Sequence, residues 1–134
     1  MIAAVLFTVS LAALGQFALY YWRAVMAGVA ARPLSDRLRA AAGLASESVG
    51  ADDFRAVMSL HDMTPRLKDD NGGLWLVWAY YNAVEALGHL AGKSLPQLAA
   101  WTQREMTTCS RYVAVLVDQR LERNLACAAE ARSS

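Results

Sequence analysis

The chain opens with an uncharged apolar run and continues with segments in which apolar residues recur at helical spacing. Residues 1–22 carry no charged side chain, and the run ends in two tyrosines and a tryptophan before the first arginine. A bilayer core about 30 Å thick needs about 20 apolar residues in a helix, with Trp and Tyr at the headgroup level and Arg beyond them. The pattern predicts a transmembrane anchor over residues 1–23, with its membrane interface at Tyr20, Tyr21, Trp22 and Arg23.

A cleaved signal peptide is the alternative for this segment, because the small residues at 27–31 suit a signal peptidase. No Lys or Arg precedes the apolar run, which is longer than the roughly 7–15 residues of a signal peptide's apolar region. Arg23 also interrupts the approach to the cleavage site. We therefore expect an uncleaved, single-pass signal-anchor.

The basic residues around the anchor predict its orientation. Only the α-amino group precedes the run, whereas Arg23, Arg32, Arg37 and Arg39 follow it. Cytoplasmic flanks of membrane helices carry the excess of Lys and Arg. We expect the N-terminus outside the cell and the C-terminal domain in the cytoplasm.

Within the anchor, Gln16 is the one strongly polar side chain, and small residues including Gly15 surround it. An amide beside small residues can bind a second helix in lipid. The simpler interpretation is one tolerated polar residue in a lone helix. Gly15 and Gln16 are thus a hypothetical helix contact.

Residues 24–51 are interpreted as a juxtamembrane helix and a linker. The helix is expected to break at Arg32, because the ring of Pro33 disfavours helical geometry in the residue before it. Ser35 can then cap a short helix over residues 37–42 that ends at Gly43. Residues 45–51 contain few apolar side chains and are typical of a linker.

Residues 52–134 are expected to form a small all-α bundle of three principal helices. Apolar residues recur at helical spacing over 53–61 and 74–91, and glycines flank the second segment. A capping box at residues 94–97 predicts the start of the last helix, which can extend to about residue 129. No run alternates with period two for long enough to indicate a sheet.

The segment 74–91 carries apolar residues on a broad face and polar ones opposite. The face expected to be buried comprises Leu76, Val77, Tyr80, Ala83, Val84, Leu87 and Leu90. The other side holds Asn82, Glu85 and His89, with Trp75, Trp78 and Tyr81 beside them.

Size, charge and cysteine usage limit the number of domains, the kind of partner and the cellular compartment that the protein can have. After the anchor, the 134-residue chain has room for one small domain, and a net charge of +1 lacks the strong positive field typical of nucleic-acid binding. Cys109 and Cys127 fall in one predicted helix, about 27 Å apart, so they cannot form an intrachain disulfide. Free thiols suit a reducing compartment.

Glu85 and His89 form the best candidate for chemistry, because residues four apart on a helix can touch. The pair can be a solvated surface pair, part of a partner-binding patch, or a metal or catalytic site. His61, Glu105 and Cys109 could complete a zinc-like ligand set, but no closely spaced Cys/His motif supports one. We predict no catalytic residue, no metal ligand and no cofactor, and the sequence leaves open whether the protein binds a small molecule.

Together these patterns predict a membrane-tethered protein-interaction module, an accessory or regulatory subunit of a membrane-associated complex. Its partners would be the lipid bilayer and another protein. The predicted contact residues are Trp75, Trp78, Asn82, Glu85 and His89, because exposed aromatics are common binding hot spots. One alternative is a membrane-anchored metal-binding protein or small enzyme using Glu85 and His89. Another is a structural subunit that binds through Gln16.

Overall fold

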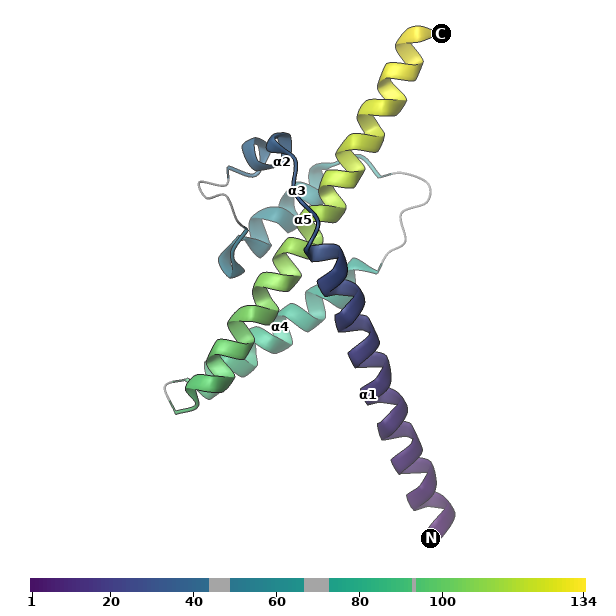
Figure 1. Ribbon diagram of the computed structural model, residues 1–134, viewed down its shortest axis with the longest axis vertical. Coiled ribbons are helices and arrows are strands. Elements are labelled where there is room, and N and C mark those ends of the chain that lie inside the picture. The colour runs from purple at the N-terminus through teal and green to yellow at the C-terminus, as the bar shows by residue number, and fades with distance from the viewer. Residues whose placement is uncertain (44–48, 67–72, 93) are drawn as a thin grey trace.

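A computed structural model describes residues 1–43, 49–66, 73–92 and 94–134. These residues form helices and no strand, so the predicted all-α class is confirmed for the described part of the chain. Figure 1 shows the elements in order: α1 (Ile2–Ala30), α2 (Asp36–Ala41), the 3-10 turn η1 (Ala51–Asp53), α3 (Phe54–Met63), α4 (Leu74–Ala91) and α5 (Pro96–Ser133).

The N-terminal part of α1 projects away from the other helices (Figure 1). Its most apolar window has a mean hydropathy of 2.1 and no buried residue, and by length and composition the helix could cross a membrane. The helix ends at Ala30, which confirms the break expected just before Pro33. Among the described residues, none covers the apolar window of α1.

The C-terminal turns of α1 belong to the core. Met26 is 1% exposed and Ala30 is also buried. Leu38 in α2 and Val49 before η1 pack into the same core cluster as Met26. The core thus draws on residues both before and after position 52, where the bundle was expected to begin. Most of the expected linker, residues 44–48, lies outside the described residues.

Helix α2 is held at its first turn. The hydroxyl of Ser35 accepts a hydrogen bond from the Leu38 amide (3.3 Å), as its predicted role as a cap requires. Ser35 in turn donates its backbone amide (2.8 Å) and its hydroxyl to the buried carboxylate of Asp118 in α5. A side chain 83 positions away thereby fixes the path of the chain after α1.

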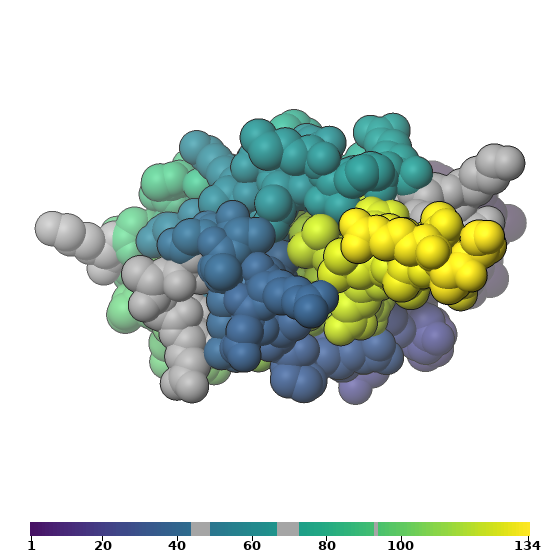
Figure 2. Space-filling model, turned by 90° about the horizontal axis from the view of Figure 1, so that it is seen from above, coloured from purple at the N-terminus to yellow at the C-terminus, as the bar shows by residue number. Residues whose placement is uncertain are grey.

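Helix α5 is the axis against which α1, α2, η1, α3 and α4 all pack. Its buried residues extend from Thr102 to Arg120, and the helix continues to Ser133, slightly beyond the expected end near residue 129. Helix α4 approaches it closely at Gly88, where a Cβ atom would lie 3.0 Å from the Thr102 hydroxyl. The last turns of α5 continue past the core and form a ridge on the surface, yellow in Figure 2.

Two predictions about local structure are wrong. Leu95 is the residue before α5 and no side chain caps this end, so the expected capping box at 94–97 does not form; Pro96 occupies the first turn instead. In α4, Leu76, Leu87 and Leu90 were expected to be buried but are exposed, Leu90 to 84%. Tyr81, expected on the polar side, is buried. Tyr81 stacks on Phe54 with ring centroids 3.9 Å apart, because η1 and α3 cover that side of α4.

Candidate functional site

Helices α1, α4 and α5 meet at a cluster of five side chains, here called the junction. Arg23 forms an ion pair with Glu105 and also donates from Nε to Oε2 over 3.2 Å. The Tyr80 hydroxyl donates to the same oxygen over 2.7 Å. The Trp22 ring meets Tyr80 edge-on at 4.9 Å, and the Arg23 guanidinium lies 5.5 Å from the centre of the Trp101 ring. The junction fixes α1 to the domain.

The junction divides the predicted membrane interface in two. Tyr20 and Tyr21 are exposed, as an interfacial position requires. Trp22 and Arg23 instead use their side chains to hold α4 and α5. Burial, and then the hydrogen bond to Glu105, raise the pKa of Tyr80 above its usual value. Tyr80 therefore stays a protonated donor at this contact.

A groove of about 270 Å³ runs between α3 and α4. Trp78 and Asn82 line it from α4, and the Asn82 amide is held by the Trp78 carbonyl at 2.8 Å. Glu85, one turn further along, pairs with Arg55 of α3, with Nη2 and Oε2 3.6 Å apart. Three of the five predicted contact residues are thereby brought to one edge of α4.

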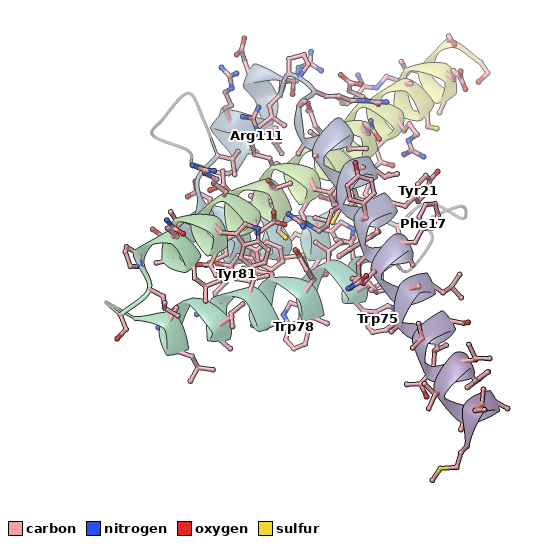
Figure 3. The ribbon with its side chains drawn as sticks, turned by 60° about the horizontal axis from the view of Figure 1, so that its bottom comes forward. Phe17, Tyr21, Trp75, Trp78, Tyr81 and Arg111 are labelled. Carbon is pink, nitrogen blue, oxygen red and sulfur yellow. The ribbon has the colours of Figure 1, made fainter. Side chains whose placement is uncertain are left out.

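A larger cleft of about 680 Å³ lies on the other side of Trp78, where its walls include Trp22 and Trp75. Trp78 lines both hollows and is 56% exposed, so its ring forms a ridge between them. Figure 3 shows Trp75 and Trp78 projecting from α4 on the side toward which the N-terminal part of α1 extends. Trp75 belongs to the cleft and not to the α3–α4 groove.

The predicted pair of Glu85 and His89 is not formed. In the described part of the chain Glu85 has its ion pair with Arg55, and His89 is exposed without an ion pair to Glu85. Arg55 of α3 lies within reach of that edge of α4 and supplies the positive charge that pairs with the Glu85 carboxylate. His89 remains near the same edge but lines neither hollow.

The ligand set of the metal hypothesis is also not assembled. His61 lies beside Asp62 (Nδ1 to Oδ1, 3.6 Å), Glu105 is bound by Arg23 and Tyr80, and Cys109 is fully buried. Among the described residues no three His, Cys, Asp or Glu side chains converge as a metal site requires. Burial and then the charge of Glu105 raise the pKa of Cys109 to about 12, so this thiol is a poor nucleophile.

The α3 wall of the groove was missed in the sequence. Arg55, Ser59 and Asp62 line it together with Met58. Their spacing of four and three residues is a helical signal for a shared outer face. This outer face could have been predicted from the sequence as the side of the helix away from Phe54, Val57 and His61, which are buried.

The predicted helix contact at Gly15 and Gln16 is exposed, and a Cβ atom on Gly15 would meet nothing within 4 Å. No part of the described chain occupies this position. A contact there would have to come from another molecule, and it stays a prediction.

Comparison with known proteins adds no family. No protein-family model, no curated protein and no solved structure matches the chain.

Proposed function

We propose that the protein is a membrane-tethered protein-interaction module, an accessory or regulatory subunit in which α1 anchors a bundle of α3, α4 and α5. The observation that carries the proposal is the ridge of Trp78 between two hollows, beside the Arg55–Glu85 pair. A large exposed aromatic flanked by depressions and oriented charges is typical of a protein-binding hot spot. Trp78, Asn82 and Glu85 contact the partner, and His89 extends the surface along α4.

The packing of α1 supports an uncleaved anchor. Met26 and Ala30 are buried in the core, and Arg23 is paired with Glu105. Cleavage in the small residues at 27–31 would remove Met26 and Arg23 from the domain. The apolar projecting part, together with the arginines that follow it, favours a span with the N-terminus outside and the bundle in the cytoplasm.

The test is comparative purification in mild detergent. Tagged wild-type protein, Trp78→Ala and Glu85→Ala are each purified, and the associated proteins are quantified by mass spectrometry. Loss of a hot-spot side chain removes about 2 kcal/mol or more of binding, so we expect at least one partner to fall about 30-fold in the Trp78→Ala sample.

Met63→Ala is the matched control, because Met63 is exposed on α3 but lines neither hollow. It should retain every partner. Retention of all partners by both Trp78→Ala and Glu85→Ala would contradict the proposed surface.

The hypothesis of a metal-binding protein or small enzyme lacks comparable support, because Glu85 is paired with Arg55 and not with His89. The hypothesis of a structural subunit binding through Gln16 makes a distinct prediction. It requires Gln16→Leu, and not Trp78→Ala, to release the partner.

A further inference from the structure

One side of α4 exposes large apolar side chains that no residue of the described chain covers. Leu90 is 84% exposed, Leu76 and Leu87 are also exposed, and Leu95 continues the surface in the turn before α5 at 55%. We call these four residues the leucine face. At about 100° per residue, Leu87 lies half a turn around α4 from Trp78. The leucine face meets the proposed protein-binding surface at Leu76, which lines the large cleft with Trp78, and its other residues line neither hollow.

The leucine face lies on the α1 side of α4. Leu76 shares the large cleft with Trp22, and Trp22 also meets Tyr80, four residues after Leu76. Trp22 is the residue that directly follows the exposed tyrosine Tyr21. The point at which α1 touches α4 is therefore one residue beyond the apolar projecting segment, and an α-helix with its side chains is only about 10–12 Å across.

The direction of α4 is the second observation. Figure 1 shows α4 running across α1 and away from it, rather than alongside it. In Figure 3, Trp75 at the start of α4 points to the side on which the N-terminal part of α1 extends. The start of α4 therefore lies beside the point at which α1 leaves its apolar segment, and the rest of α4 extends away from the anchor.

The composition of this side of α4 fits an interfacial helix. The ionisable residues of α4 other than its tyrosines are Glu85 and His89, and Glu85 is turned to Arg55 on the other edge. Leucines with a flanking tryptophan are the residues that amphipathic surface helices insert between headgroups and acyl chains. A charged rim on this face would instead have favoured water.

We infer that the leucine face is a second membrane contact: Leu76, Leu87, Leu90 and Leu95 lie in the headgroup region of the bilayer that α1 spans. The occupant is the lipid surface itself. The domain is thus held against the membrane at two places, the end of the anchor and the leucine face. This inference rests on the proposed anchor.

The test measures label depth in the full chain reconstituted into phosphatidylcholine vesicles. Nitroxide labels are placed at Leu90→Cys and at Leu11→Cys, each with Cys127→Ser, and on native Cys127 of the otherwise unchanged protein. Cys109 is fully buried and does not compete for the reagent. Electron paramagnetic resonance then compares accessibility to oxygen, which concentrates in lipid, with accessibility to a water-soluble nickel chelate.

We expect the labels at positions 11 and 90 to be more accessible to oxygen and the label on Cys127 to be more accessible to nickel. A position 90 label as nickel-accessible as Cys127, with position 11 still in lipid, would overturn the membrane contact and leave the anchor standing. Shielding of position 90 from both reagents would also overturn it, by showing that protein covers the face. A water-exposed label at position 11 would refute the anchor and this inference together. Leu95→Cys serves as the second position if Leu90→Cys does not fold.

Discussion

The two cysteines differ in reactivity because of where α5 places them. Cys109 is buried beside Glu105, and its pKa is raised from 9.0 to about 12, whereas Cys127 is exposed near the free end of the helix. The thiolate is the reactive form, so Cys127 should react with thiol reagents much faster than Cys109.

At mildly alkaline pH we therefore expect a maleimide to modify Cys127 alone, and to modify both thiols after denaturation, as counted by mass spectrometry. A raised pKa means that the folded state binds the thiol proton more tightly than the unfolded state. The stability from this group is complete below pH 9.0 and is lost as the pH rises toward 12. Rapid modification of Cys109 in the native protein would contradict its burial.

Glu105 is the residue whose loss should damage the junction most, since it accepts from both Arg23 and Tyr80. Replacement by Ala leaves two donors without their acceptor, and we expect a loss of about 1–3 kcal/mol of unfolding free energy in urea titrations. Glu105→Gln keeps one acceptor oxygen and should lose less. Glu122→Ala, at an exposed position of the same helix, should change stability by no more than about 0.5 kcal/mol.

At the scale of elements, α1 has two roles along one helix. In the described part of the chain no residue of its apolar window is buried, whereas its last turns fill the core with Met26. The two parts should respond differently to substitution.

Met26→Ala should lower the unfolding free energy by about 2–5 kcal/mol, because it opens a cavity against α5. The neighbouring Val25, 44% exposed, gives the control. Val25→Ala should lower the free energy by much less in the same detergent. Equal effects at the two positions would show that the last turns of α1 do not pack as described.

Helix positions could be predicted from the sequence more reliably than helix orientations. The expected range of α4, residues 74–91, matches the structure, and so does the cap at Ser35. The buried side of α4 could not be predicted fully, because apolar residues lie almost all round it and periodicity then has no clear phase. Tyr81 is inside because Phe54 stacks on it, a contact 27 residues away that no local pattern encodes.

The candidate site was predicted in part for the same reason. Trp78, Asn82 and Glu85 were identified because they share an edge of one helix. Arg55 and Asp62 reach that edge from a separate helix, and Glu105 reaches Arg23 across 82 positions. Contacts of this kind depend on how helices dock, which helical spacing alone does not determine.

At the scale of the whole molecule, the two chain ends lie at opposite extremes (Figure 1). With α1 in a membrane, the free end of α5 points away from the bilayer. This arrangement makes Cys127 a reporter of topology.

In intact cells we expect a membrane-impermeant maleimide to leave Cys127 unmodified, and to modify it after the membrane is opened with detergent. The reason is the excess of arginine after the apolar segment, which favours a cytoplasmic domain. The protein should also stay in the membrane fraction after alkaline carbonate extraction. Modification of Cys127 in intact cells would reverse the proposed orientation.

The length and continuity of α5 fix the distance between its two ends. Its 38 residues correspond to about 57 Å, and after Pro96 the helix contains no glycine or proline at which it would kink. One end begins beside Leu95 at the proposed lipid contact, and the other stands clear of the core. With the proposed anchor and lipid contact in place, the helix would be a rigid spacer that keeps anything bound to its final turns at a set height above the bilayer.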